Sequence, residues 1–559
     1  MCKRIRLLIW LITGLLFLVS GKLFYLQIIK GKDLAEKAVI LHSRIFEAEE
    51  HYRGEILDHN LISLTDSGLR PCLMVFPEDC LVHCAELAEL LGLVVQECEK
   101  QLKAKQEPFL LKINLSKEEV KKLREVNFPG TAIVLVKTRY GPHSLAKHLI
   151  GYLNSINTAQ WEELTRNGKT IDMNNFWPGA YRRTDKIGVA GLEKEYEEIL
   201  RGARPEKKLK GLTDARGQLL EGLGYKFKDE VVDSWRNHLI LTIDHFCQEC
   251  VEKIMDEKIE KGAVVVIDIP SGDLLALASR PDFDQNNIVQ YLDEEEVFLE
   301  RTRRRAFYPG SVFKTVVAAG VLEENLVEPA EKFVCTGSYL FSDQTEINCL
   351  SKHGSLDLRQ ALIKSCNSIF VQLGLRLGAD KLMFYANNLG FEIDLGDSIP
   401  PALLGNASLG QEGVLVSPLQ IANLYATIAR GGLYKPCRLV AEIRNYQGDL
   451  IQDFPTALPR RVLKTSTCQI LKEALSEVCR SGTGQLAWVG KEGTAGKTGT
   501  AQVNEQGKVI AWFAGFTPVE EPRLAIVVMV EEKKVVQGSL RGGEVAAPLF
   551  REIAAAICQ

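Results

Sequence analysis

The chain has 559 residues, too many for one hydrophobic core and enough for two or three domains. Its 68 Lys and Arg residues nearly balance 72 Asp and Glu residues, which leaves a net charge of -4. That balance argues against nucleic acid as a partner, because phosphate binding usually requires an excess of basic residues.

The N-terminal segment 7–29 is apolar except at Lys22 and Gln27. A run of about 20 apolar residues matches the thickness of the bilayer core and predicts a transmembrane helix. The basic residues before it favour a cytoplasmic N-terminus and export of the remainder: Lys3, Arg4 and Arg6. A cleaved signal peptide is the alternative, but no small-x-small cleavage site follows the apolar run. We therefore expect residues 1–30 to form a cytoplasmic tip and a single-pass anchor in the cell membrane.

Residues 31–235 have mixed, irregular patterns and predict a separate domain. Residues 53–60 predict a short strand that runs into a turn, and residues 116–119 open a helix with a capping box. A further amphipathic helix is expected to end near Gly202. Nothing in this stretch carries an evident reaction.

The pattern changes from about residue 236. An alternating strand and a helix through Lys261 come first, followed by two β-rich runs around the turn at 270–273. Residues 310–435 are mostly helical, with a helix start at 417–418, and three strands and a last helix follow. Strands at both ends with helices between them predict one α+β domain over 236–559, in which a sheet is assembled from distant pieces and a helical insert packs on it.

Ser311 and Lys314 form a Ser-x-x-Lys motif just after Pro309-Gly310. At this spacing the two side chains share one face of a helix, and a serine in the first turn lies near unpaired backbone N–H groups. The residues that follow are apolar nearly all round, so the helix should be buried. Burial lowers the pKa of a lysine and favours the neutral amine that a proton acceptor requires. Alone, however, Ser-x-x-Lys is a common chance match.

Ser365 and Asn367 lie between two helix-like segments, where a hydroxyl and an amide can project into a cleft. Ser365 can relay a proton, and Asn367 can hydrogen-bond a peptide as donor and acceptor. The alternative is a simple cap, in which Ser or Asn starts the next helix.

Residues 497–500 (Lys-Thr-Gly-Thr) lie in a predicted strand. Gly499 leaves room for a close backbone approach, and an edge strand can pair with an extended substrate. Lys497 with the hydroxyls of Thr498 and Thr500 suits a terminal carboxylate. The alternative is an ordinary turn with a solvated lysine.

Two other patterns in the sequence favour structural roles. Ser144 and Lys147 form a second Ser-x-x-Lys motif, but no apolar helix backs it and no Lys-Thr-Gly strand follows at a domain's distance. Cys247 and Cys250 have CxxC spacing without a second pair at metal-site spacing, which favours packing in a helix.

Cys335 and Cys349 bracket a polar loop in the expected exported part, where a disulfide could persist. Whether they form one is left open, because the sequence does not show their geometry.

Together, the three motifs around Ser311, Ser365 and Lys497 occur in the order typical of serine β-lactamases and penicillin-binding proteins. The chain resembles the class B penicillin-binding proteins, the monofunctional peptidoglycan transpeptidases, along nearly its whole length. The resemblance also rests on matches outside the three boxes: 53–60, with His59 where the family is usually basic, 139–140, 148–151, 188–193, 200–202, 410–411, 417–420, 542–543 and 546–548. Cys366 and the loop from Cys335 through His353 are similar to the sporulation-associated branch.

The resemblance implies a membrane anchor, an elongated N-terminal pedestal over 31–235 and a transpeptidase domain with a central antiparallel sheet over 236–559. It implies Ser311 as nucleophile, with Lys314 and Ser365 moving its proton. Backbone N–H groups of Ser311 and Thr500 would form the oxyanion hole. Asn367, Lys497, Thr498, Gly499 and Thr500 would bind substrate, and neither a metal nor an organic cofactor is needed.

The implied partners are peptidoglycan stem peptides, β-lactams, the cell membrane and a separate glycosyltransferase. A D,D-carboxypeptidase, a β-lactamase or β-lactam sensor, and a catalytically silent cell-wall scaffold remain alternatives. The sequence leaves open whether such an enzyme serves cell shape, division or sporulation.

Overall fold

The computed structural model describes most of the chain, which is divided into two compact units. The described residues are 2–31, 34, 43–46, 53–105, 108–170, 179–183, 185–202, 208–212, 225–228, 236–294, 296–328, 330–396, 398–502, 509–533 and 541–558. The first unit comprises Met1–Tyr52, Gly68–Thr138 and Arg204–Asp233, and the second comprises Arg53–Ser67, Arg139–Ala203 and Ser234–Gln559.

The first unit begins with one long helix, α1, which continues into the short π-helical turn η1. Residues Leu8–Ile29 have the length and mean hydropathy of a membrane span, and none of that span is buried. This is the apolar helix that the sequence predicts, and it is a single-pass membrane anchor.

The rest of the first unit contains a three-stranded sheet in the order β4-β3-β5 with short helices packed against it. A second three-stranded sheet has the order β1-β8-β9. The elements of this unit are α1 (Cys2–Phe24), η1 (Tyr25–Ile29), β1 (Ser43–Phe46), β3 (Gly68–Val75), α3 (Pro77–Cys80), η2 (Leu81–His83), α4 (Cys84–Leu91), α5 (Val95–Ala104), β4 (Phe109–Lys112), α6 (Lys117–Val126), β5 (Thr131–Thr138), β8 (Lys208–Leu212) and β9 (Tyr225–Lys228).

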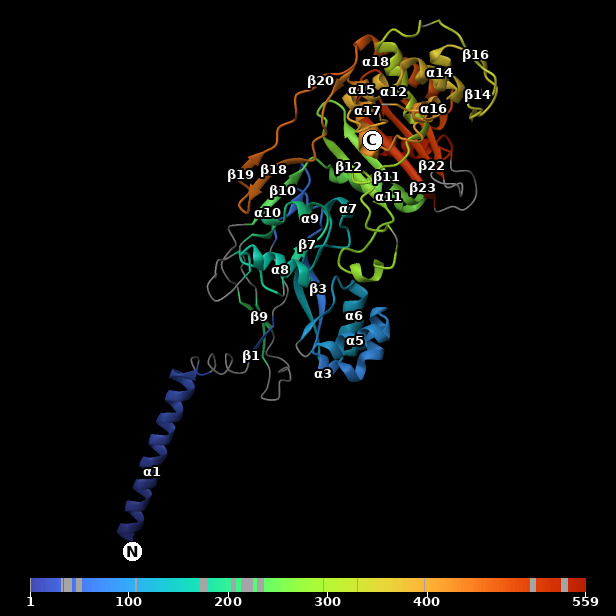
Figure 1. Ribbon diagram of the computed structural model, residues 1–559. Helices are drawn as coiled ribbons and strands as arrows, with labels where there is room; N and C mark the ends of the chain where they lie inside the picture. Colours follow the sequence, from blue (N-terminus) through green and yellow to red (C-terminus); the bar gives the residue numbers. More distant parts are fainter. Residues whose placement is uncertain are drawn as a thin grey trace. The chain divides into compact units, whose positions relative to one another are not determined.

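The second unit is built on a five-stranded antiparallel sheet in the order β12-β11-β23-β22-β21. Its strands come from distant parts of the chain, as the green and red arrows lying side by side in Figure 1 show. Those strands are β11 (Ile259–Asp268), β12 (Leu274–Arg280), β21 (Ala495–Gln502), β22 (Val509–Thr517) and β23 (Leu524–Lys533). The predicted α+β architecture, with one central sheet assembled from distant pieces of the chain, is therefore confirmed.

Both faces of this sheet are buried. Successive side chains on each strand point to opposite sides, and each side packs against a different core. On β11, Val264 and Val266 pack in one core with α11 and α19, while Val265 and Ile267 pack in the other core with the helical insert. The sheet is thus a central layer between two sets of helices, which explains why its strands are apolar on both faces.

The helical insert lies between β12 and β21 in sequence and carries the first two motifs. Its first long helix, α12 (Lys314–Glu323), is buried at every position from Lys314 to Val321, as its all-round apolar sequence predicts. The elements from η3 to α18 are η3 (Ile288–Tyr291), η4 (Gly310–Val312), β13 (Phe333–Cys335), β14 (Ser338–Leu340), β15 (Glu346–Asn348), β16 (Gly354–Leu356), α13 (Leu358–Ile363), α14 (Asn367–Leu377), α15 (Ala379–Asn388), α16 (Pro401–Ser408), α17 (Pro418–Ala429), β17 (Leu433–Tyr434), β18 (Val440–Asn445), β19 (Leu450–Asp453), β20 (Arg460–Arg461) and α18 (Thr465–Arg480).

The other elements of the second unit include a four-stranded sheet in the order β19-β18-β10-β2. They are β2 (Ile56–Leu57), α7 (Lys147–Ile150), β6 (Leu153–Ser155), α8 (Thr158–Arg166), β7 (Lys186–Gly188), α9 (Gly191–Glu195), α10 (Glu197–Arg201), β10 (Asn237–Leu241), α11 (His245–Lys258), η5 (Gln485–Ala487) and α19 (Ala546–Ile557).

Local signals predicted several element ends. Ser116 and Ser417 each form a capping box at the start of a helix, with Glu119 and Gln420 as the reciprocal partners. The helix expected to run through Lys261 ends at Lys258, because the chain is already paired as strand β11 from Ile259.

Candidate active site

Ser311 lies in the short 3-10 turn η4, which leads through Phe313 directly into α12. The serine is therefore just before the α-helix rather than in its first turn, and Lys314 is the first residue of that helix. Gly310 has φ 56° and donates its N–H to the Gly410 carbonyl at 2.8 Å. The turn holds Ser311 half-buried beside the fully buried Lys314.

The buried amine of Lys314 contacts the second motif. Its Nζ donates to Asn367 Oδ1 at 2.6 Å and to the Ser365 carbonyl at 2.9 Å, and it lies 3.4 Å from the Ser365 hydroxyl. These contacts place two predicted site residues, Ser365 and Asn367, around the Lys314 nitrogen.

Ser365 lies in the junction between α13 and α14 and has φ 52°, in the left-handed region that a serine rarely adopts. The N-cap of α14 is Cys366, whose side chain makes no capping hydrogen bond. Neither Ser365 nor Asn367 is a simple helix cap. Instead, Asn367 Nδ2 donates to the Asn348 carbonyl at 2.9 Å, and Ser365 is 5% exposed.

The third motif lies on β21, which is an edge strand of the central sheet as predicted. Lys497 is opposite Ala514 on β22, and both residues are fully buried. The Lys497 amine donates to the Ser365 hydroxyl at 2.9 Å and to the Thr498 carbonyl at 3.0 Å. Lys497 is therefore not the solvated lysine of the alternative interpretation. Its contact with the Ser365 hydroxyl joins the third motif to the second.

The other residues of this strand have different surroundings. The Thr498 hydroxyl lies 2.7 Å from the Thr483 hydroxyl, and the exposed Thr500 accepts the N–H of Gly542 at 3.3 Å. Gly499 is buried, and a Cβ on it would lie 2.8 Å from the Pro309 carbonyl oxygen. The glycine therefore lets the turn that carries Ser311 lie directly against β21.

Burial lowers the pKa of both amines. It lowers the pKa of Lys314 to about 8, and it lowers that of Lys497 well below its ordinary value, with the nearby Lys314 charge adding to the effect. Both buried amines contact the Ser365 hydroxyl. The site therefore disfavours a positive charge on both lysines at once until an anion enters it.

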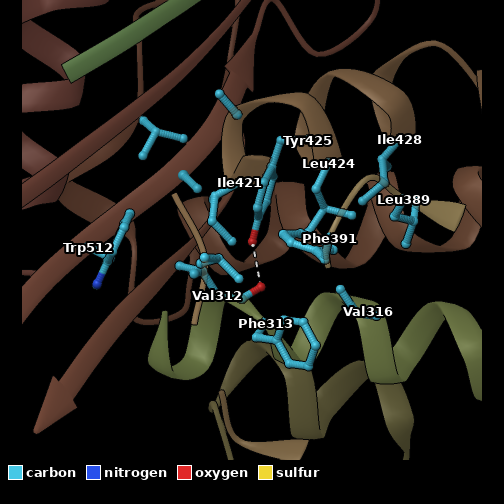
Figure 2. Close-up of a cluster of buried hydrophobic side chains, with 14 of the residues drawn as sticks. Val312, Phe313, Val316, Leu389, Phe391, Ile421, Leu424, Tyr425, Ile428 and Trp512 are labelled. Atoms are coloured by element: carbon cyan, nitrogen blue, oxygen red, sulfur yellow. Dashed lines mark hydrogen bonds between the residues drawn. The ribbon is translucent and has the colours of Figure 1, made fainter. Parts of the chain in front are cut away.

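Buried apolar side chains pack against the turn that carries Ser311, as Figure 2 shows. Val312 and Phe313 of the turn pack against residues of α17 and against Phe391. The Tyr425 hydroxyl donates to the Val312 carbonyl at 3.2 Å and pairs with the Thr315 hydroxyl at 3.0 Å (Figure 2 shows the first bond). Tyr425 thus fixes the backbone next to Ser311.

Comparison with known families gives two matches that together cover most of the chain. Residues 262–555 match the penicillin binding protein transpeptidase domain, and residues 48–226 match the penicillin-binding protein dimerisation domain.

The chain belongs to the penicillin-binding protein transpeptidase family.

It is a class B penicillin-binding protein, since similar proteins match it over nearly its full length. Stage V sporulation protein D of Bacillus subtilis is 27% identical over 98% of this chain and 85% of that protein. The peptidoglycan D,D-transpeptidase FtsI of Buchnera aphidicola is 25% identical over 99% of this chain and 94% of that protein. Among solved structures, the ceftriaxone acyl-enzyme complex of penicillin-binding protein A from M. tuberculosis has a TM-score of 0.57 and 25% identity, over 66% of this chain and 88% of that one.

The second Ser-x-x-Lys motif of this penicillin-binding protein has ordinary structural partners. Ser144 is buried and donates to Gln285 Oε1 at 2.6 Å, while Lys147 forms an ion pair with Asp282 at 2.5 Å. No amine approaches the Ser144 hydroxyl in the hydrogen bonds of the described residues.

Several N-terminal residues that carry the family resemblance meet in a buried ion cluster of the second unit. Arg53 bonds Glu193 at 2.9 Å and Glu197 at 2.7 Å, Arg139 bonds Glu193 at 2.6 Å, and the Tyr140 hydroxyl donates to Glu193 at 3.2 Å. Burial alone would raise the pKa of Glu193, but the charges of Arg139 and Arg53 hold it below its ordinary value. These motifs therefore have a structural role, since a buried charge must be paired.

Sequence reasoning gave no role to Tyr425, Thr483, Gly410 or Gly542. The two glycines could have been singled out from the sequence, because both belong to short segments that match the family. A Cβ on Gly410 would lie 2.3 Å from the Gly310 carbonyl oxygen, and one on Gly542 would lie 2.3 Å from that of Gly499. The two glycines allow neighbouring segments to pack closely around the site.

Proposed function

We propose that the enzyme is a peptidoglycan D,D-transpeptidase that works through an acyl-enzyme on Ser311. The observation that carries the assignment of the residues is the Ser365 hydroxyl, which lies within hydrogen-bond distance of both Lys314 and Lys497. The lysine assigned to proton transfer and the lysine assigned to substrate binding thus contact the same hydroxyl. The names of the similar proteins and the match to the transpeptidase domain support the reaction.

In the first step the Ser311 hydroxyl attacks the carbonyl of the penultimate D-Ala of a stem peptide, and Lys314 accepts its proton. The backbone N–H groups of Ser311 and Thr500 donate to the oxyanion that forms, each worth about 3–4 kcal/mol in such sites. The C–N bond to the terminal D-Ala then breaks, and the proton reaches the leaving amine through Ser365.

The substrate's terminal carboxylate is held by Lys497 with Thr498 and Thr500, and Asn367 bonds the amide of the acyl donor. An incoming carboxylate raises the pKa of Lys497, because an opposite charge favours the ammonium form. Gly499 keeps β21 close to the turn of Ser311. Substrate binding therefore charges the anchoring lysine at the moment when the charge is required.

In the second step an amine from a neighbouring stem peptide attacks the acyl-enzyme, which forms the crosslink and frees Ser311. Penicillin acylates the same hydroxyl by opening its β-lactam ring.

The residue assignment is tested by labelling the full-length protein with a fluorescent penicillin and analysing its tryptic peptides by mass spectrometry. Cleavage after Arg305 and Lys314 places Ser311 in peptide 306–314, and cleavage after Arg139 and Lys147 places Ser144 in peptide 140–147. We expect the label on 306–314 and its loss in Ser311→Ala, with the fold retained. A label on peptide 140–147, or labelling that survives Ser311→Ala and is lost in Ser144→Ala, overturns the assignment.

Product analysis separates the alternative activities. With a pentapeptide donor and an amine acceptor, a transpeptidase yields a crosslinked product, whereas a D,D-carboxypeptidase yields only the shortened donor. Turnover of the penicillin acyl-enzyme indicates a β-lactamase, and an unlabelled, folded protein indicates a scaffold.

The division at residues 30 and 235 into anchor, pedestal and transpeptidase domain is part of the proposal. So are a cytoplasmic N-terminus and an extracytoplasmic catalytic domain, which the basic residues before the anchor support. A C-terminal alkaline phosphatase fusion that is active in cells is the expected result. We also propose that a separate glycosyltransferase makes the glycan strands, and crosslinking in cells tests that partner.

A further inference from the structure

Three cysteines and one histidine from separate segments meet beside the second motif of the active site. Cys335 ends β13, Cys349 follows β15, His353 precedes β16 and Cys366 is the N-cap of α14. Their sulfur atoms and the imidazole nitrogen all lie within 4.8 Å of one another. None of the three thiols is in a disulfide. The bridge between Cys335 and Cys349 that the sequence leaves open is therefore not formed in this structure.

The distances in this cluster are those of a tetrahedral metal site. Cys349 Sγ lies 3.7 Å from Cys366 Sγ and 3.4 Å from His353 Nδ1, and Cys335 Sγ lies 3.6 Å from that nitrogen. With Zn–S bonds of about 2.3 Å and Zn–N bonds of about 2.0–2.1 Å, a tetrahedron places two sulfurs about 3.8 Å apart and a sulfur about 3.5 Å from a nitrogen. A disulfide would use two of the sulfurs and leave the third thiol and the imidazole without a reason to converge.

The surroundings also suit ligation. The other ring nitrogen of His353 lies 3.1 Å from the Ser351 hydroxyl, a contact of the kind that fixes the ring of a metal-bound histidine. The Asn367 N–H donates to Cys349 Sγ at 3.2 Å, which favours a thiolate there. Cys335 and Cys366 are fully buried while Cys349 and His353 are half-buried, so an ion can reach the cluster from one side.

We propose that Cys335, Cys349, His353 and Cys366 bind one Zn²⁺ ion that holds Ser365 and Asn367 in place. Three thiolates and an imidazole are soft ligands that select zinc over magnesium or calcium. All three sulfurs bind as thiolates, so each thiol that is still protonated releases its proton to solvent when the ion binds. Cys366 lies between Ser365 and Asn367 in the chain, so the ion ties the active-site junction to the loop that carries the other three ligands.

These four are positioning residues, because none of them touches Ser311 or the expected substrate in the interactions of the described residues. The Asn367 side chain is held from the same loop, through its bond to the Asn348 carbonyl next to Cys349. Loss of the ion would free the loop and the junction together. The proposal has two parts. The expectation that acylation is slower without metal rests on the proposed function, in which Ser311 is acylated, whereas the expectation of bound zinc does not.

The test uses full-length protein, purified in detergent under reducing conditions with a histidine-free tag. We expect about one zinc per chain by elemental mass spectrometry, and tetrahedral d–d and thiolate charge-transfer bands when Co²⁺ replaces it. His353→Ala should lose the metal, and His353→Cys, which supplies a fourth thiolate, should retain it. Cys437→Ser is the matched control, since that half-buried cysteine lies outside the cluster and should leave the metal content unchanged.

Acylation is measured with fluorescent penicillin before and after a zinc chelator, and again after zinc is restored. We expect a roughly 10–100-fold fall on removal, as for lost metal-site support elsewhere, and recovery on return. His353→Ala should be slow and His353→Cys near wild type. Four results would each overturn the site. Two concern the metal: no zinc after purification together with no cobalt bands, or stoichiometric iron or copper in place of zinc. The other two are a Cys335–Cys349 disulfide in peptide maps made without reductant, and zinc retained in both His353→Ala and Cys335→Ala. Acylation that is unchanged by zinc removal would overturn the coupling.

Discussion

The Lys497 amine donates a hydrogen bond to the Ser365 hydroxyl at 2.9 Å, so the residue expected to bind the substrate carboxylate also orients the residue expected to relay the proton. With its oxygen accepting from Lys497, Ser365 has its own O–H proton free to point toward a leaving group. Carboxylate binding and proton delivery are therefore not separate functions of the third and second motifs. They depend on one another through this single contact.

This contact predicts that Lys497→Ala and Ser365→Ala will not have additive effects on acylation. Each single change should slow penicillin acylation by roughly 10–150-fold, which corresponds to the loss of a charged hydrogen bond of about 1.5–3 kcal/mol. The double variant should be little slower than the worse single variant, because the two groups act as a unit. Stopped-flow labelling of all four proteins measures the cycle. Fully additive losses would show that the contact has no functional role.

The pH dependence of acylation follows from the pKa of Lys314, which burial lowers to about 8. Lys314 must be neutral to accept the Ser311 proton, and its deprotonated fraction rises as the pH rises through that pKa. The acylation rate should therefore increase about tenfold per pH unit below about pH 8 and level off above it. Burial is the largest cause of the lowered pKa of Lys314, and the negative charges of Cys349 and Cys366 oppose it. A rate that is flat from about pH 6 to 9, or near wild-type acylation by Lys314→Ala, would exclude Lys314 as the base.

Gly410 offers a test of how tightly the turn that carries Ser311 is held. It has φ 70°, and a Cβ there would lie 2.3 Å from the Gly310 carbonyl oxygen, next to Ser311. Gly410→Ala should displace the turn and slow acylation by at least tenfold. In the matched control Gly448→Ala, φ is 92° but nothing lies within 4 Å of the added Cβ. That variant should have the backbone strain of about 1–3 kcal/mol without a loss of acylation. Equal rates for the two alanine variants would mean that close packing at Gly410 is irrelevant to the site.

Local signals in the sequence were sufficient for the elements that carry the motifs. The helix start at Ser417-Pro418, the buried helix after Lys314 and the turn at residues 270–273 each depend on neighbours in the chain, and each is confirmed. The order of the strands in the sheet depends on tertiary packing, which the sequence does not show. The edge position of β21 was suggested only because an edge strand can pair with an extended substrate.

The sequence could not show how deeply the site is buried. Lys497 was expected to be a cation, yet it is fully buried and its pKa lies well below its ordinary value. The sequence does not show the convergence of the three cysteines and His353 for a related reason. Cys335 ends β13, Cys349 and His353 lie in the loop between β15 and β16, and Cys366 starts α14, at spacings that fit none of the short metal motifs, so only the fold brings the four together.

The buried ion cluster around Glu193 predicts a large loss of stability without any effect on the chemistry of the site. Glu193→Ala leaves Arg53 and Arg139 buried without their shared partner, which should lower the free energy of unfolding of the second unit by about 3–5 kcal/mol. Glu195→Ala is the matched control on the same helix, because Glu195 pairs with Arg304 at the surface and such pairs contribute about 0–1 kcal/mol. The free energy of unfolding of both variants is measured by urea titration, with loss of penicillin labelling as the signal for unfolding.

The same cluster sets the direction of a pH effect. The pKa of Glu193 is lower in the folded protein than in the unfolded chain, so its stabilising contribution is fully present above the unfolded pKa and disappears as the pH falls through the folded one. The gap in unfolding free energy between wild type and Glu193→Ala should therefore be constant near neutral pH and shrink below about pH 4, the ordinary range for glutamate. A gap that widens on acidification, or a Glu195→Ala loss as large as that of Glu193→Ala, would mean that charge pairing at Glu193 does not stabilise this unit.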